Sequence, residues 1–380
     1  MTTRRVPTRE PAGGRDVITL RVLLALCLTM TACGGGGAPG DAGRDGARDG
    51  EPGDGATDAA TPCWSVAASM DAPPDACPTV LDDALLEVPT SLVVDETTLY
   101  WTEQEQGVSG EGDVASCPKS GCGGNPTMLA TFQKFPTAIT VDATNVYWIV
   151  PGAVLSCAKG GCGGNPTALV SGSMLSVLSI ASDGTNVYLS SNQGIGFCAA
   201  TGCNNTPTIL ASPSVAPNPL FLAVDGTTVY WTENGVVPNG TVMSCPKSGC
   251  GDAAVTLATG LMPQLIVVNA SGVYWNAPNQ SGNTGAIWTC AKTGCNGTPT
   301  MLANTDEVFG LAANDTNVFW TQANNVFGSI VRCAAGGCSN SPTTMIDVGA
   351  TRPDSPSLDQ TNIYWFDQYV PAQILTVPQE

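Results

Sequence analysis

Histidine is absent from the sequence. Its absence excludes Ser-His-Asp and Cys-His nucleophile activation and every metal site that uses imidazole ligands. Charged side chains are also scarce, at 12% of the 380 residues, and acidic residues outnumber basic residues by 32 to 14. The formal net charge of -18 repels nucleic acid and anionic lipid headgroups, so we expect no nucleic-acid partner.

Glycine and proline, in contrast, are abundant, with 44 and 28 residues. Both residue types punctuate strands and are unfavourable inside helices. We therefore expect a turn-rich, all-β protein without long helices.

The N-terminus has the pattern of an export signal. An apolar run at residues 22–32 follows Arg15 and Arg21 and is shorter than the about 20 residues of a membrane span. The letters TMTAC, which end at Cys33 and precede GGGG, resemble the lipobox of bacterial lipoproteins. The resemblance implies that residues 1–32 are a lipoprotein signal peptide and that Cys33 is acylated. The alternative is an ordinary secretory signal with an incidental cysteine.

The segment after the signal is rich in Gly, Ala, Asp, Arg and Pro. Such a composition is too polar to fold, so residues 33–62 are expected to be a flexible tether between the lipid and a domain at residues 63–380. We expect this domain to be exported and lipid-anchored in the bacterial cell envelope, at the outer membrane.

A short aromatic motif recurs in this domain at intervals in the forties. Its copies read LYW, VYW, VYL, VYW, VYW, VFW and IYW and begin at Leu99, Val146, Val187, Val229, Val273, Val318 and Ile363. Each copy has four short apolar segments, except that the last stops after its third. A period in the forties with four strands per unit is typical of propeller blades.

The N-terminal end of the domain supplies the missing segment. Residues 78–82 match the fourth segment of a copy but have no blade of their own. We therefore expect a seven-bladed β-propeller whose N-terminal strand is the outer strand of the last blade and closes the ring. Tyr and Trp neighbours point to opposite faces of a strand, so each blade should pack against both neighbours through them.

The aromatic motifs resemble the YWTD repeats of low-density-lipoprotein-receptor propellers, and the whole unit resembles exported bacterial repeat proteins. The resemblance covers about residue 77 to the C-terminus and implies the fold, not the receptor function. YWTD propellers have six blades, lack CxxxxC pairs and carry Asp as the fourth motif residue. This chain has Glu103, Val150, Ser191, Glu233, Ala277, Gln322 and Asp367 there.

Sixteen cysteines in an exported chain indicate a disulfide framework. Twelve form CxxxxC pairs between the third and fourth segments, where a hairpin brings the Cα atoms within bridging distance. The pairs are Cys117 with Cys122, Cys157 with Cys162, Cys198 with Cys203, Cys245 with Cys250, Cys290 with Cys295, and Cys333 with Cys338. Zinc is disfavoured because the pairs lie on separate blades, and redox cycling is the weaker alternative. We expect Cys63 and Cys77 to pair, and Cys27 to leave with the signal peptide.

The connections of an antiparallel blade divide between two faces of the ring. The turn face carries the first-to-second and third-to-fourth connections. The former begin with Asp95, Asp142, Asp183, Asp225, Asn269, Asn314 and Asp359, which we interpret as Asx turns rather than calcium ligands. The latter carry lysines, interpreted as solvated or as a docking site for an anionic partner: Lys119, Lys159, Lys247 and Lys292.

The loop face carries the remaining connections, whose lengths vary, as in 103–113, 233–240, 276–285 and 322–329. Variable loops on a rigid scaffold are common binding sites. Its acidic residues are low-specificity candidates for a calcium or cationic-ligand site, against plain solvated charge: Glu103, Glu105, Glu111, Asp113 and Glu233.

Three functions are compatible with this pattern. The first is a non-catalytic binding or scaffold module, expected to be a monomer, that is displayed by its lipid and binds a protein or carbohydrate ligand on the loop face. The second is a carboxylate-based carbohydrate-active enzyme that uses acids such as Glu103 and Glu233. The third is a structural envelope component. We predict no catalytic residues, no metal ligands and no cofactor for the first function.

Overall fold

The computed structural model describes residues 78–379, apart from 86, 106–109, 234, 236–239, 280–283, 325–326, 350 and 369–371. The described residues belong to one compact unit, Asp58–Glu380, and form strands and turns. This confirms the all-β expectation. None of these residues forms a helix that could cross a membrane. The predicted signal peptide, the tether and Cys27, Cys33, Cys63 and Cys77 lie outside the described residues.

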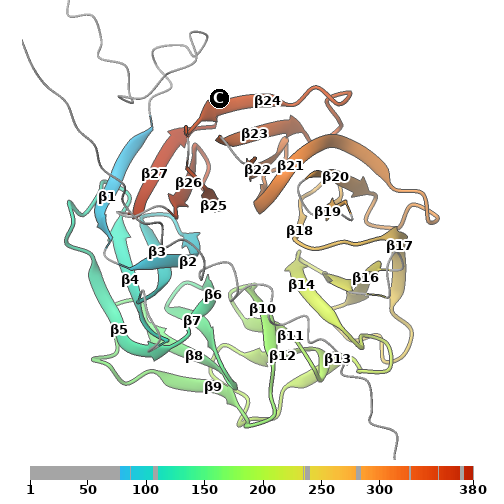
Figure 1. The fold of residues 1–380 in the computed structure, drawn as a ribbon. Coiled ribbons are helices and arrows are strands. Elements are labelled where there is room, and N and C mark those ends of the chain that lie inside the picture. The colour runs from blue at the N-terminus through green and yellow to red at the C-terminus, as the bar shows by residue number, and fades with distance from the viewer. Residues whose placement is uncertain are drawn as a thin grey trace, which may run out of the picture. The chain divides into compact units, whose positions relative to one another are not determined.

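Four-stranded antiparallel sheets follow one another around a centre, with the first strand of each innermost (Figure 1). The first sheet consists of β2 (Val88–Val94), β3 (Thr98–Gln104), β4 (Glu111–Pro118) and β5 (Thr127–Lys134). The second consists of β6 (Thr137–Val141), β7 (Asn145–Val150), β8 (Ala153–Ala158) and β9 (Thr167–Ser171). The third consists of β10 (Val177–Ser182), β11 (Asn186–Ser191), β12 (Gly194–Ala199) and β13 (Thr208–Ala211). The fourth consists of β14 (Pro219–Val224), β15 (Thr228–Glu233), β16 (Gly240–Pro246) and β17 (Val255–Leu261).

A seven-stranded sheet comes next, in which two four-stranded units share one long strand. It consists of β18 (Ile266–Val268), β19 (Val273–Pro278), β20 (Thr284–Cys290), β21 (Thr300–Ala313), β22 (Asn317–Ala323), β23 (Gly328–Ala334) and β24 (Thr343–Asp347). The first half of β21 pairs with β20 and its second half pairs with β22. One strand is therefore outermost in one four-stranded unit and innermost in the next.

The last sheet combines the two ends of the described chain. It consists of β25 (Pro353–Leu358), β26 (Asn362–Asp367), β27 (Ala372–Pro378) and β1 (Thr79–Leu85). β1 pairs antiparallel with β27, with Thr79 opposite Thr376. The structure therefore shows the predicted pairing of the N-terminal strand β1 with the C-terminal strand β27.

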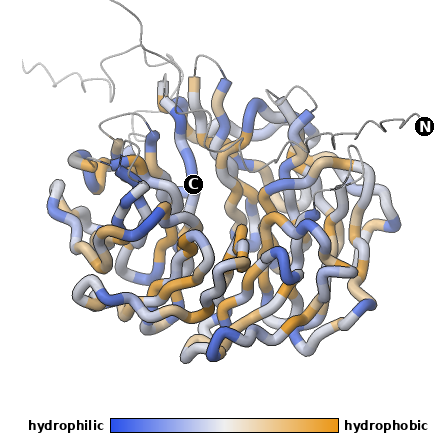
Figure 2. Tube along the Cα trace, turned by 60° about the horizontal axis from the view of Figure 1, so that its bottom comes forward, coloured by the Kyte–Doolittle hydropathy of each residue, from blue (hydrophilic) through white to orange (hydrophobic). Residues whose placement is uncertain are grey.

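The aromatic pairs pack the sheets against one another, as predicted. Trp101 of the first sheet belongs to a buried cluster with Leu81, Tyr364 and Ile374 of the last sheet. Its neighbour Tyr100 lies in a different cluster, with Trp148 of the second sheet. Figure 2 shows apolar stretches that run along the strands of neighbouring sheets. The six tryptophans of these motifs are fully buried, at 0% exposure, so the sheet faces form the core. They are Trp101, Trp148, Trp231, Trp275, Trp320 and Trp365.

The Asx residues close the turns of the turn face in the expected way. The Oδ1 atom of Asp95 accepts hydrogen bonds of 2.8 Å from the amides of Thr97 and Thr98, and its Oδ2 atom accepts one of 3.1 Å from the Tyr100 hydroxyl. The amide pattern recurs at the six other Asx residues. At each of the five Asx aspartates, one side chain therefore shapes the turn and also accepts a hydrogen bond from the tyrosine hydroxyl of the same repeat.

The four turn-face lysines are neither freely solvated nor free for an anionic partner, which corrects both interpretations. Each reaches back to the Asx aspartate of the preceding sheet at 2.7 to 2.9 Å. The pairs are Lys119 with Asp359, Lys159 with Asp95, Lys247 with Asp183, and Lys292 with Asp225. The turn hydrogen bonds already fix the position of each aspartate, so each lysine pairs with a preorganised carboxylate.

The six CxxxxC pairs form the predicted local disulfides, with Cα–Cα distances of 5.1 to 5.6 Å. Each bridge lies in a hairpin that also contacts the preceding sheet. The Cys122 amide donates to the Leu81 carbonyl at 3.2 Å, and the Cys250 amide donates to the Leu210 carbonyl at 3.2 Å. The bridges thus hold the hairpins in the shape that joins neighbouring sheets.

Candidate binding site on the loop face

Two of the five predicted loop-face acids face each other across one hairpin. Glu103 lies near the end of β3 and Asp113 near the start of β4, and the two residues are direct cross-strand partners. Glu105 and Glu111 lie beside them, and the Glu105 amide donates to the Glu111 carbonyl at 2.9 Å. Glu233 ends β15, in the fourth sheet. The structure therefore brings four of the candidates together and separates Glu233 from them by two sheets.

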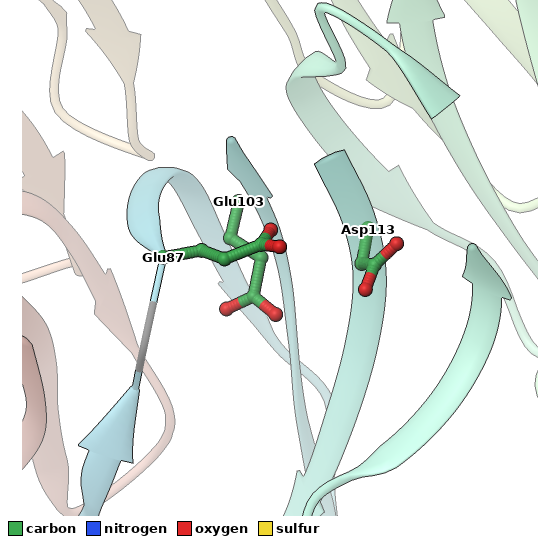
Figure 3. Close-up of side chains that lie close together, drawn as sticks. All are labelled: Glu87, Glu103 and Asp113. Atoms are coloured by element: carbon green, nitrogen blue, oxygen red, sulfur yellow. The ribbon is translucent and has the colours of Figure 1, made fainter. Parts of the chain in front are cut away.

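Glu87 completes the cluster and was not among the candidates predicted from the sequence. It lies between β1 and β2, and its carboxylate approaches those of Glu103 and Asp113 (Figure 3). One carboxylate oxygen from each residue lies within 4.8 Å of those of the other two. Glu87 immediately precedes the first strand of a repeat, and only the packing of β2 beside β3 shows where its side chain goes.

Glu103 also has an internal role that the sequence analysis missed. Glu103 is only 6% exposed, so its carboxylate is not a solvated surface charge. Its Oε2 atom accepts a 2.8 Å hydrogen bond from Nε1 of Trp101, because residues two apart in a strand project from the same face. Glu233 accepts the same bond from Trp231 at 2.8 Å. The signal was present in the sequence as Trp-x-Glu.

Burial and mutual repulsion raise the pKa values of the clustered carboxyl groups Glu87, Glu103 and Asp113. Burial raises the pKa of Glu87 to about 7, and the charges of Asp113 and Glu105 add to the effect. Burial also raises the pKa of Glu103 to about 7; the bond from Trp101 opposes the shift, and the charge of Glu87 reinforces it. The pKa of Asp113 is raised as well, first by burial. A positive charge near the three groups would favour their ionised forms.

The donor set limits what these residues can hold. Carboxylate oxygens suit hard cations such as Ca²⁺, and they also pair with ammonium or guanidinium groups. Within the described part of the chain, Glu87, Glu103 and Asp113 form no ion pair with a lysine or arginine. In addition, the Oε2 atom of Glu87 is buried and accepts no hydrogen bond. The cluster is therefore suited to a cationic ligand.

Comparisons with known proteins identify the fold alone. No protein-family model matches the sequence, and no curated protein matches it. A structure of YCF48 bound to D1 peptide is similar over 82% of this chain and 97% of that one, with 10% identity and a TM-score of 0.57. The WD40 β-propeller domain of Doa1 is similar over 77% of this chain and 94% of that one, with 10% identity and a TM-score of 0.52.

A peptidase also shares the fold. A puromycin-hydrolysing peptidase of Mycobacterium tuberculosis is similar over 79% of this chain, with 12% identity and a TM-score of 0.58. The similarity spans only 53% of the peptidase. The chain is thus a β-propeller, and its structural relatives include binding proteins as well as peptidases.

Proposed function

We propose that the ring has seven blades and that β1 closes it. The β1–β27 ladder and the shared core of the first and last sheets support this proposal. So does the Lys119–Asp359 pair, which repeats at this junction the ion pair found between other neighbouring sheets. Deletion of residues 63–85 should lower the melting temperature sharply, because it removes β1 from that core. Deletion of residues 34–60 is the matched control and should leave the melting temperature unchanged.

We propose that the closed ring is a non-catalytic binding or scaffold module that uses its loop face. A contrast between the two faces carries the proposal. On the turn face four aspartates and four lysines are paired between neighbouring sheets. On the loop face Glu87, Glu103 and Asp113 lie together and form no ion pair with a lysine or arginine of the described residues. The YCF48 chain, which has a similar fold, is bound to a peptide in its structure, so the scaffold accommodates protein ligands.

The module should be displayed from the bacterial envelope by a lipid on Cys33. The lipobox-like sequence before that cysteine and the polar tether after it support this part of the proposal. Metabolic labelling with a palmitate analogue should mark the wild-type chain and leave Cys33→Ala unmarked. Labelling that persists in the variant would contradict the anchor.

Binding is tested with the intact chain. Chemical cross-linking in whole cells, followed by isolation of the chain, should recover a defined partner. The control is a chain with charge-reversed loop-face acids, Glu105→Lys and Glu111→Lys, which should recover less of it. Isolation of the chain alone, under conditions that retain known envelope complexes, would contradict the proposed function.

A carbohydrate-active enzyme is the second candidate, and one observation favours it. The pKa values of Glu87 and Glu103, at about 7, are those of a general acid that is protonated near neutral pH. Glu103 and Asp113 replace the pair of Glu103 and Glu233 in this hypothesis. Turnover of any member of a glycan panel that is lost in both Asp113→Asn and Glu103→Gln would favour the enzyme over the binding module.

A further inference from the structure

Two exposed phenylalanines lie next to the acidic cluster. Phe132 is 78% exposed and Phe135 is 45% exposed, although large aromatic side chains gain most from burial. Phe132 lies near the end of β5, and Phe135 lies between β5 and β6. Both positions belong to the connection between the first and second sheets on the loop face. Exposed aromatic groups of this kind commonly mark interaction surfaces.

The backbone holds both rings in unusual conformations. Phe132 has φ 58° and Phe135 has φ 44°, and a non-glycine residue in this region costs about 1 kcal/mol. A bulge in the β4–β5 pairing produces the first of these conformations. The Phe135 amide donates to the Gly110 carbonyl at 2.6 Å. Burial within the chain does not offset this cost for Phe132, whose ring stays outside.

Asp113 links Phe132 to the acidic cluster. Its Oδ1 atom accepts a 3.0 Å hydrogen bond from the Phe132 amide, while its carboxylate also lies in the cluster with Glu87 and Glu103. We call Phe132, Phe135, Glu87 and Asp113 the aromatic-acidic patch. The backbone of the exposed Phe132 is thus bonded to a carboxylate that forms no ion pair with a lysine or arginine in the described residues.

We propose that the aromatic-acidic patch docks a basic segment of a partner protein, with one arginine or lysine side chain lying across Phe132 and its charged end at Glu87 and Asp113. This inference rests on the proposed binding function and deepens it. Long basic side chains combine an apolar stem with a terminal cation, and a guanidinium group both stacks on aromatic rings and pairs with carboxylates. Glu103, buried below and bonded to Trp101, reinforces the negative potential without having to touch the ligand.

Charge complementarity selects this occupant. The chain carries a net charge of -18, which repels nucleic acid and anionic lipid. A bare divalent cation would use the three carboxylates but would leave the Phe132 ring without a contact. A basic peptide segment uses both parts of the patch.

The test uses the full chain and a fluorescein-labelled peptide that alternates arginine and leucine, at low ionic strength. Fluorescence anisotropy should show binding of this peptide and none of its counterpart with glutamate in place of arginine. Phe132→Ser should weaken binding by about fivefold, the contribution expected of an exposed cation–π contact. Glu87→Gln should weaken it by a similar factor. Phe327→Ser is the matched control, because Phe327 is 55% exposed on another loop-face connection, and it should bind as the wild type does.

Three results would overturn the inference. They are the absence of binding to the wild-type chain, equal weakening in Phe132→Ser and Phe327→Ser, and tight binding of Ca²⁺ alone that Glu87→Gln abolishes and Phe132→Ser leaves intact. The last result would assign a metal site instead. Failure of this inference differs from failure of the proposed function: a partner cross-linked in cells that contacts other loop-face residues preserves the function and overturns only the patch.

Discussion

The two faces of this propeller treat the same acidic residues in opposite ways. On the turn face, burial alone would raise the pKa of Asp95, but hydrogen bonds from Lys159 and from the Thr97 and Thr98 amides outweigh it and lower the pKa to about 2. On the loop face, burial raises the pKa of Glu103 to about 7. The difference arises because Asp95 receives several hydrogen bonds, one of them from a lysine of the neighbouring sheet, whereas the bond from Trp101 to Glu103 does not outweigh burial.

Reduction of the disulfides should have the largest effect on this comparison. Each six-residue loop contributes about 2 kcal/mol in the chain-entropy account, and the bridged hairpins carry lysines and cysteine amides that contact the preceding sheet. Full reduction and alkylation should therefore abolish the cooperative unfolding transition in circular dichroism. The control is alkylation without reduction, which should leave the transition unchanged. A reduced chain with an unaltered transition would mean that the core alone holds the sheets together.

Loss of an Asx aspartate should have the next largest effect. Asp359→Ala removes two turn hydrogen bonds of 2.7 Å, the bond from Tyr364 and the ion pair with Lys119. We expect urea denaturation to show a loss of about 2–3 kcal/mol in the free energy of unfolding. Asp183→Ala is the matched change at an internal junction.

The comparison of these two sites tests ring closure directly. If β1 closes the ring, the Lys119–Asp359 and Lys247–Asp183 pairs should show equal coupling in double-mutant cycles, about 1 kcal/mol each. Coupling at the internal pair and none at Lys119–Asp359 would indicate an open junction between the first and last sheets.

The pH dependence of stability should have opposite signs on the two faces. The folded-state pKa of Asp95 is about 2, below its ordinary value of 3.8, so its contribution is complete above about pH 4 and is lost as the pH falls through 2. The folded-state pKa of Glu103 is about 7, above its ordinary value of 4.5. The folded state then holds a proton that the unfolded state releases, and the free energy of unfolding falls as the pH rises from 4.5 to 7.

Glu103→Gln isolates the loop-face contribution. The glutamine can still accept the Trp101 hydrogen bond, as Gln322 does from Trp320 at 2.9 Å, but it no longer titrates. Denaturation curves across this pH range should be flatter for the variant than for the wild type. Asp95→Asn is the counterpart and should change only the acid side. An unchanged slope in Glu103→Gln would show that Glu103 is ionised in the folded state.

The smallest expected effect is a gain in stability. Asp142 is an Asx aspartate without a lysine, because the next hairpin has Ala200 at the lysine position; the Tyr147 hydroxyl contacts both Asp142 Oδ2, at 2.7 Å, and the Ala200 carbonyl, at 3.2 Å. Ala200→Lys should add a fifth ion pair and raise the free energy of unfolding by about 0.5 kcal/mol. Ala335→Lys is the control, because its partner Asn269 is neutral, and it should give no gain in the same urea titration.

Much of the fold could be predicted because the same sequence motif recurs in every repeat. The repeat period shows where each copy begins. Within a copy, local geometry accounts for the aromatic pair, the Asx position and the CxxxxC spacing. The sheet pairing of residues 78–82 with the C-terminal strand followed from the same register. Predictions that rest on residues before Pro78 remain predictions.

The candidate site was predictable only in part. Glu103, Glu105, Glu111 and Asp113 were identified from the acidic character of one loop, and cross-strand pairing does bring them together. Glu233 shares the Trp-x-Glu sequence and the bond from its own tryptophan with Glu103, but it lies in the fourth sheet, away from the cluster. Glu87 and Phe132 gave no local signal, since their contacts with Asp113 join residues 26 and 19 positions apart through strand pairing in the first sheet.

The sequence by itself therefore determined the strands, the turns, the bridges and the packing direction of the aromatic pairs, because each depends on residues close together in the chain. The tertiary structure decided which charges are paired. The lysines meet aspartates of the preceding sheet only after the sheets pack side by side. Glu87 meets Glu103 and Asp113 only after β2, β3 and β4 pair within the first sheet. Electrostatic energy depends on distance and burial in space, and neither quantity can be read from residue order.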